Sequence, residues 1–151
     1  MKIIIVGATS GIGKKMAEEY ARKGNNVGIT GRRKELLDEI QQSYPAQIET
    51  ECFDVTQNEN KIYLEALVNK LAGLDILVIS SGGGDVSKSL NWELDKMTVN
   101  TNVNGFVEIA NWGFNYFANQ NTGSLVTISS VAANRGNSWA PAYSASKSIS
   151  E

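Results

Sequence analysis

The stretch KIIIVGATSGIGKK, residues 2–15, joins a short apolar run directly to a segment rich in glycine. The β-branched residues at positions 3–6 predict a buried strand. Gly7, Gly11 and Gly13 predict a tight turn that opens a helix and brings backbone amides close to a pyrophosphate. A plain strand-to-helix turn without a ligand is the alternative. A phosphate loop of this kind occurs in nucleotide triphosphatases and in dinucleotide-dependent oxidoreductases.

The loop lacks two features that a triphosphatase needs. Its pattern closes with Gly-Lys-Ser or Gly-Lys-Thr, whose hydroxyl holds magnesium, whereas Gly13 and Lys14 are followed by Lys15. Asp75 begins its predicted strand, so it does not stand where a magnesium-binding aspartate closes one. Phosphate hydrolysis is therefore disfavoured, and Lys14 and Lys15 are interpreted as solvated helix residues.

The rest of the chain alternates short β-branched runs with segments of helical period, which predicts a parallel sheet with crossover helices in one domain, residues 1–151. Strands are expected near residues 2–6, 26–30, 47–53, 74–79 and 123–128. Helices are expected near residues 12–23, 33–43, 58–72 and 95–118, with a last one from about 142. An apolar stripe in the long fourth helix predicts core or subunit contact: Val99, Val103, Phe106, Val107, Ala110, Phe114 and Phe117.

Composition excludes several classes of function. The net charge of −2, with scattered basic residues, gives no footprint for nucleic acid. No apolar run is long enough for a membrane span or a signal peptide, so we expect a cytoplasmic protein without membrane contact. Cys52 is the single cysteine, expected as a small core residue at a strand end, and no metal site is predicted. Histidine is absent, so no imidazole base is available.

The end of the second predicted strand reads GITGRR, residues 28–33. An NAD-specific fold places an acidic residue here for the ribose 2′-hydroxyl. Arg32 and Arg33 instead match a 2′-phosphate, because the planar guanidinium binds phosphate through paired hydrogen bonds. The other interpretation is a solvated basic helix start, although positive charge is slightly unfavourable there. We expect NADP(H) to be preferred over NAD(H).

The segment SSVAANRGNSWAPAYSASK, residues 129–147, follows the fifth predicted strand. Tyr143 and Lys147 are four residues apart at a helix start and project from one face. The lysine charge favours the phenolate form of the tyrosine, which suits the tyrosine to general acid–base work. Ser129 and Ser130 lie at the strand end, where a hydroxyl can hold a substrate oxygen. This arrangement predicts proton transfer to a carbonyl oxygen while hydride reaches its carbon.

The glycine loop, the YSASK motif and the serine that precedes its tyrosine together resemble the short-chain dehydrogenase/reductase family, in its classical, NADP-preferring subgroup. The resemblance implies a Rossmann-type α/β fold: a doubly wound parallel sheet in three layers, α/β/α, with strand order 3-2-1-4-5. It implies that Ser130 holds the substrate oxygen, Tyr143 is the acid/base and Lys147 binds the nicotinamide ribose. Asn102, which precedes Gly105 in an Asn-x-x-Gly pattern, is assigned to a water relay behind Lys147.

The same resemblance implies the residues that bind the cofactor. FDV at residues 53–55 is similar to the family's adenine contact. The implied cofactor set is Gly7, Thr9, Ser10, Gly11, Ile12, Gly13, Arg32, Arg33, Asp54, Val55, Ser81, Gly82, Tyr143 and Lys147. The implied reaction moves hydride between nicotinamide and a small carbonyl or secondary alcohol, in a homodimer or homotetramer.

The sequence departs from the family pattern at three places. The fourth strand ends in ISSG, residues 79–82, where the family has Asn-Asn-Ala-Gly, and Val6 replaces a threonine. Family members continue to two further strands and a substrate-covering loop, so the 151 residues are expected to be part of a longer enzyme. An inactive NADP-binding regulatory protein of the same fold is the alternative function. An epimerase or dehydratase of the extended relatives fits the glycine spacing less well.

Overall fold

A computed structural model describes residues 1–84 and 89–150 and contains one five-stranded parallel sheet. Its strands are β1 (Lys2–Val6), β2 (Asn26–Gly31), β3 (Ile48–Cys52), β4 (Ile76–Ile79) and β5 (Ser124–Thr127). Their spatial order is β3-β2-β1-β4-β5, which confirms the predicted Rossmann-type topology. In register, Ile5 of β1 lies opposite Ile29 on one side and Val78 on the other. All four pairings are parallel, so the carboxyl ends of the strands meet at one edge of the sheet.

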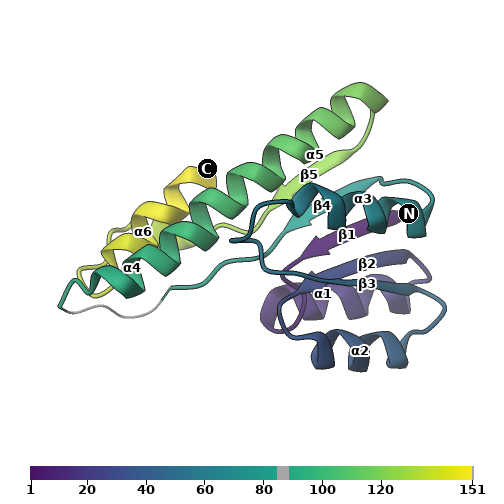
Figure 1. The fold of residues 1–151 in the computed structure, drawn as a ribbon, viewed down its shortest axis with the longest axis horizontal. Helices are drawn as coiled ribbons and strands as arrows, with labels where there is room; N and C mark the ends of the chain where they lie inside the picture. Colours follow the sequence, from purple (N-terminus) through teal and green to yellow (C-terminus); the bar gives the residue numbers. More distant parts are fainter. Residues whose placement is uncertain (85–88, 151) are drawn as a thin grey trace.

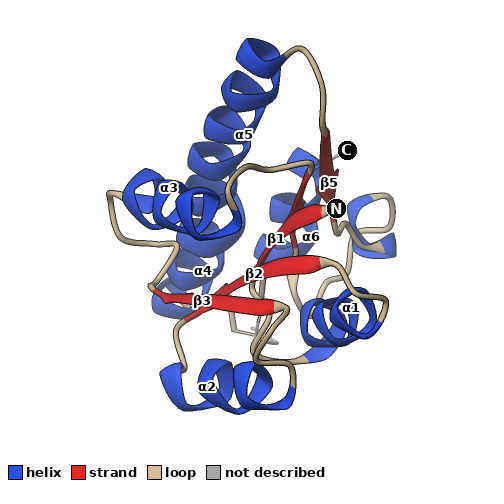
Figure 2. Cartoon of the chain, turned by 90° about the vertical axis from the view of Figure 1, so that its right-hand side faces the viewer, coloured by secondary structure: helices blue, strands red, loops and turns tan. Residues whose placement is uncertain are grey.

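Helices cover both faces of this sheet (Figure 2). Side chains of β1 alternate between the two layers, as a strand with period two requires. Ile3 and Ile5 pack in a core cluster with α1 (Gly11–Arg22) and α2 (Lys34–Ser43). Ile4 and Val6 pack in a second cluster with α3 (Asn60–Leu71) and the long α5 (Phe106–Gln120). The chain is therefore a three-layer α/β/α structure with β1 at its centre.

The predicted fourth helix is built from three consecutive segments. These are α4 (Trp92–Val99), the π-helical turn η1 (Asn100–Gly105) and α5, and they form one long rod beside α6 (Pro141–Lys147) (Figure 1). The predicted apolar stripe is only partly buried, because Phe117 is 9% exposed whereas Phe114 is 68% exposed. Instead, Ile109 and Gly113 join Phe117 as the buried positions of α5.

Two short 3-10 turns lie in the last part of the described chain, η2 (Val131–Ala133) after β5 and η3 (Ser148–Ser150) after α6.

Cys52 ends β3 as predicted, but it is exposed, so the prediction of a core cysteine is wrong. β3 is the outer strand of the sheet, and only its first residue, Ile48, is buried, whereas Phe53 directly after Cys52 returns to the core. Within residues 1–84 and 89–150, no helix combines the length and the apolar character that crossing a membrane requires.

Candidate active site

The glycine loop connects β1 to α1 with its backbone held tightly. Gly7 has φ +86°, a conformation that L side chains rarely adopt. The backbone amides of Gly7 and Ala8 both donate to the carbonyl of Thr30, at 3.1 and 2.8 Å. A Cβ at Gly13 would collide with the Gly7 carbonyl oxygen, so only glycine allows the first turn of α1 to approach the loop this closely. The loop is thus shaped by backbone contacts rather than by side chains.

The N-terminus of α1 is open to an anion. Its N-cap residue, Ser10, makes no side-chain hydrogen bond to the helix amides. The Ser10 hydroxyl accepts instead from Arg33 Nη2 at 3.0 Å, and the Thr9 hydroxyl accepts from the same nitrogen at 2.7 Å. Unsatisfied amides and the helix dipole favour negative charge at such an end. The loop and the arginine therefore form a positively polarised cradle that fits the phosphates of a dinucleotide.

Arg32 and Arg33 point to two different parts of this cradle. Arg33 lies over the glycine loop through Thr9 and Ser10. The Arg32 side chain is largely exposed, and its Nη1 lies 3.8 Å from Asp54 Oδ2. Exposed ion pairs at this distance contribute little to stability. The Arg32 guanidinium consequently remains available to a ligand at the carboxyl end of β2, and Arg33 lies beside it over the loop.

Asp54 and Val55 follow β3 at the same edge of the sheet and are held by the long helix. Asp54 Oδ1 accepts from the amide and the hydroxyl of Thr56, both at 2.9 Å. The Val55 carbonyl accepts from Asn60 Nδ2 at 3.0 Å, and that nitrogen also donates to Glu108 of α5 at 2.8 Å. These bonds fix the backbone that the sequence assigns to the adenine end of the cofactor.

The ISSG segment keeps its place in the sheet despite its departure from the family pattern. The Ser80 amide donates to the Val6 carbonyl at 2.9 Å, and the Ile128 amide donates to the Ile79 carbonyl at 3.0 Å. Ser81 borders the glycine loop so closely that a Cβ at Gly7 would lie 2.6 Å from its backbone. The Ser81 hydroxyl is buried and has no hydrogen-bond partner among residues 1–84 and 89–150. The backbone of the ISSG segment is therefore paired with both neighbouring strands.

Asn102 lies in the π-helical turn and is 4% exposed. Its Oδ1 accepts from the Gly83 amide at 3.0 Å, and its Nδ2 donates to the Gly83 carbonyl at 2.8 Å. The same Nδ2 donates to the Ser146 hydroxyl of α6, also at 2.8 Å. A π-turn adds a residue to a helix and often marks a functional site. Asn102 thus joins the segment after β4 to the helix that carries Tyr143.

Tyr143 and Lys147 lie on α6 against the glycine segment 82–84. Lys147 Nζ donates to the Ile128 carbonyl at 3.0 Å and lies 5.9 Å from the centroid of the Tyr143 ring. A Cβ at Gly82 would lie 3.0 Å from Lys147 Nζ, and one at Gly84 would collide with the Tyr143 ring. The tyrosine and the lysine therefore share one side of the site with the end of β4.

Ser130 is half-buried at the start of η2, just after the carboxyl end of β5. Its hydroxyl accepts from the Ala132 amide at 3.2 Å, which caps the turn. Because the Ser130 hydroxyl only accepts in this bond, its proton can still be donated to another group. Because η2 packs on α6, the serine reaches the site through the same edge of the sheet as Lys147.

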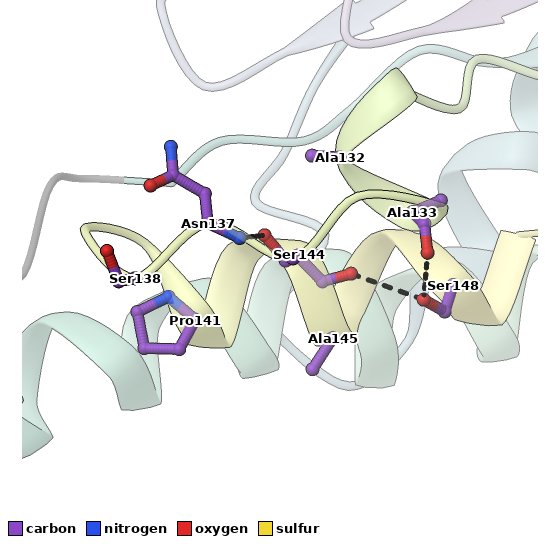
Figure 3. Close-up of a pocket in the computed structure, with 9 residues that line it drawn as sticks. Ala132, Ala133, Asn137, Ser138, Pro141, Ser144, Ala145 and Ser148 are labelled. Atoms are coloured by element: carbon purple, nitrogen blue, oxygen red, sulfur yellow. Dashed lines mark hydrogen bonds between the residues drawn. The ribbon is translucent and has the colours of Figure 1, made fainter.

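A cavity of about 440 Å³ lies between the segment after η2 and α6 (Figure 3). The Ser144 hydroxyl accepts from the Asn137 amide at 3.2 Å, and the Ser148 hydroxyl donates to the carbonyls of Ala133 and Ser144. Its lining is made of small and polar residues: Ala132, Ala133, Gly136, Asn137, Ser138, Pro141, Ser144, Ala145 and Ser148. None of the four predicted catalytic residues lines this cavity, so it is distinct from the Tyr143 side of the helix.

A model of the short chain dehydrogenase family matches residues 1–149. The chain belongs to the short-chain dehydrogenase family. Among curated relatives, an "uncharacterized oxidoreductase" of Myxococcus xanthus is 32% identical over 97% of this chain and 60% of its own length. One of Staphylococcus saprophyticus is 33% identical over 95% of this chain and 64% of its own length. This chain thus spans less than two thirds of the length of these relatives.

Solved structures agree with the family assignment. A short-chain type dehydrogenase/reductase from Mycobacterium ulcerans is 28% identical with a TM-score of 0.91, covering 99% of this chain and 58% of its own. An actinorhodin polyketide ketoreductase solved with NADPH is 26% identical with a TM-score of 0.89, covering 97% of this chain and 59% of its own. These similarities show that the chain has the short-chain dehydrogenase fold.

Three residues of the site escaped the sequence analysis. Ser146 bridges Asn102 and α6, Gly84 packs on the Tyr143 ring, and Glu108 holds Asn60 beside Val55. The glycine run at 82–84 and the second serine of YSASK, Ser146, are visible in the sequence, but neither shows its partner there. Their contacts join segments that are brought together only by the fold.

Proposed function

We propose that this protein is an NADP-dependent oxidoreductase that moves hydride between nicotinamide and a small carbonyl or secondary alcohol. The observation that carries the proposal is the packing of α6 on the segment after β4. This contact brings Tyr143 and Lys147 to the carboxyl edge of the sheet, where Gly84 abuts the tyrosine ring and Gly82 approaches the lysine ammonium. In an open α/β sheet, ligands bind at this edge.

The glycine loop and the arginines support a dinucleotide at that edge. The open N-terminus of α1 fits a pyrophosphate, and Ser81, whose buried hydroxyl has no partner, borders the loop. Arg33 over the loop and Arg32 beside Asp54 fit a 2′-phosphate at the adenine ribose. When bound, the nicotinamide supplies or accepts the hydride. We therefore propose NADP(H) as the preferred cofactor.

The chain's own residues manage the proton. Tyr143 donates its hydroxyl proton to the carbonyl oxygen during reduction and takes it back from the alcohol during oxidation. Ser130 donates a hydrogen bond to the same oxygen and fixes its position. Lys147, anchored on the Ile128 carbonyl and 5.9 Å from the centroid of the Tyr143 ring, is assigned to binding the nicotinamide ribose. The water relay assigned to Asn102 stays a prediction, because its side-chain amide is engaged with Gly83 and Ser146.

The proposal is tested by following NADPH oxidation at 340 nm against a panel of aldehydes and ketones. We expect turnover with at least one class of carbonyl, and loss of that turnover in Tyr143→Phe. NADPH binding without oxidation across the whole panel would contradict the proposal and would favour the non-catalytic regulatory alternative. Unchanged turnover in Tyr143→Phe would remove the tyrosine from the mechanism.

A further inference from the structure

Ser146 lies on α6 between Tyr143 and Lys147 but faces away from solvent, with 3% of its surface exposed. Its hydroxyl donates to the Tyr143 carbonyl at 2.8 Å. The same oxygen accepts from Asn102 Nδ2 at 2.8 Å. Asn102 in turn holds Gly83 through both of its amide atoms. A continuous chain of hydrogen bonds therefore runs from the glycine segment after β4 to the backbone of the tyrosine.

The direction of each bond in this chain is determined by chemistry. A backbone carbonyl only accepts, so the Ser146 proton points to Tyr143 and its oxygen is left to accept from Asn102. The bond to Ser146 is possible only if the NH₂ group of Asn102 faces Ser146. The Gly83 amide is a donor, so the Oδ1 atom of Asn102 must face Gly83. One orientation of the Asn102 amide satisfies every partner. The reversed orientation would bury unpaired groups and cost free energy.

We propose that Ser146 is a positioning residue that holds Tyr143 in place against the glycine segment, residues 82–84. The segment packs directly on the phenol ring through Gly84, so a shift of α6 relative to the segment moves the reacting hydroxyl. Ser146 acts through Asn102 and the tyrosine backbone rather than on the substrate. The effect on catalysis rests on the proposed function, whereas the link between Ser146 and Gly83 is a property of the fold.

Ser144 offers a matched control on the same helix. It is buried to a similar degree, 6% exposed, and its hydroxyl also accepts a backbone hydrogen bond, from Asn137 at 3.2 Å (Figure 3). Its partner lies in the segment before α6 and not in the π-helical turn. Ser144→Ala therefore removes a buried hydroxyl from α6 without touching the Asn102 network.

The link is tested by amide hydrogen exchange, measured by NMR on the ¹⁵N-labelled chain. Ser146→Ala should speed exchange of the Gly83 amide by about tenfold, because Asn102 loses the partner that fixes its orientation. Ser144→Ala should leave the exchange rate of the Gly83 amide within about twofold of wild type, and Ser146→Thr should restore the wild-type rate. An unchanged Gly83 rate in Ser146→Ala, or an equal increase in Ser144→Ala, would overturn the proposal. If Ser146→Ala does not fold, Ser146→Cys replaces it in the same comparison with Ser144→Ala. Cysteine is close to serine in size and weakens the hydrogen bonds to the Tyr143 carbonyl and to Asn102.

The catalytic consequence is tested separately by steady-state kinetics. Ser146→Ala should lower kcat by about tenfold with little change in the KM for the carbonyl, because the tyrosine is misplaced and substrate contacts are kept. Ser146→Thr should recover kcat. Faster Gly83 exchange with an unchanged kcat would overturn the positioning role. A wild-type protein without turnover would contradict the proposed function alone, since the exchange measurement still decides whether Ser146 holds the segment.

Discussion

β1 and β5 belong to the same parallel sheet and both pair with β4, but they differ sharply in burial. The four apolar residues of β1, Ile3 to Val6, are fully buried under helices on both faces. Leu125 and Val126 of β5 are 37% and 36% exposed. Within residues 1–84 and 89–150, the sheet thus has a fully covered centre and a partly exposed edge at β5, although the hydrogen-bond ladder is continuous across both.

This difference separates the two tasks of the site. The glycine loop, which we propose binds the cofactor, leaves the end of β1 and is fixed by core packing and by backbone contacts at Gly7 and Gly13. The helix α6, which we propose carries the proton-transfer residue, leaves the β5 side and is fixed by polar links, from Asn102 to Ser146 and from Lys147 to Ile128. Substitutions near β1 should therefore lower stability, whereas substitutions near α6 should lower turnover.

The largest expected effect is on stability and compares the two strands directly. Ile4→Ala removes a fully buried side chain from the central strand and should lower the free energy of unfolding by about 2–5 kcal/mol. Leu125→Ala removes a partly exposed side chain from β5 and should cost less than about 1 kcal/mol. Urea denaturation followed by circular dichroism gives both values. Equal losses would show that the edge strand is as well packed as the centre.

The next effect concerns cofactor choice. Arg32→Asp combined with Arg33→Ala should reduce the preference for NADPH over NADH by about 10- to 100-fold, because each charge-assisted hydrogen bond contributes about 1.5–3 kcal/mol. Affinities for both cofactors are measured by the quenching of tryptophan fluorescence. Lys34→Ala is the matched control, since Lys34 follows Arg33 in sequence but pairs with Asp38. A wild-type preference for NADH would contradict our interpretation of the arginine pair.

A smaller effect is expected at the contact between the glycine segment and the tyrosine. Gly84→Ala places a methyl group against the Tyr143 ring and should reduce kcat by about tenfold, since overpacking costs about 1–3 kcal/mol. At Gly83 the space for a Cβ is open, so Gly83→Ala should lower kcat far less. Steady-state kinetics of the two variants make the comparison. An equal loss of kcat in both variants would show that contact with the Tyr143 ring is not what makes a side chain harmful in this segment.

The smallest effect lies on α1, far from the chemistry. A hydrogen bond from Arg22, assisted by one from Lys15, holds the pKa of the exposed Glu19 carboxyl below its usual value. Because the folded-state pKa is lowered, the stabilisation is present above the unfolded-state pKa and is lost as pH falls through the lowered one. NMR titration of the Glu19 carboxyl should show its pKa rising in Arg22→Ala. An equal Glu19 pKa in wild type and Arg22→Ala would show that the ion pair between Glu19 and Arg22 does not form in solution.

The sheet was predictable from sequence because its signals are local. The apolar run before Gly7 and the turn residues between the later strands predicted all five strands, and their observed order is the one that the family resemblance implies. Strand ends shifted by one or two residues, as at β4, which begins at Ile76 rather than near residue 74. The prediction for Cys52 was wrong because β3 turned out to be the outer strand of the sheet, where a small apolar residue can lie on the exposed side.

The positions of the catalytic residues required the fold. Ser146 and Gly83 are far apart in sequence and meet only through Asn102, whose orientation depends on a π-helical turn that no helical period predicts. The apolar stripe of the long helix was predicted as core or subunit contact, and the structure shows which of its residues are buried: Phe117 is 9% exposed, whereas Phe114 is 68% exposed. Contacts of this kind depend on tertiary register rather than on local pattern.

The central claim, that cofactor binding and proton transfer reside in separately built parts of the molecule, is tested most directly with Tyr143→Phe. NADPH affinity and turnover are measured on the same preparations of wild type and variant. Tyr143 belongs to the implied cofactor set, but most of that set lies on the glycine loop and at the arginine pair. We therefore predict a dissociation constant for NADPH within about twofold of wild type and a loss of turnover of about 10²- to 10⁴-fold. A variant that keeps its turnover, or one that loses NADPH binding together with activity, would contradict the account.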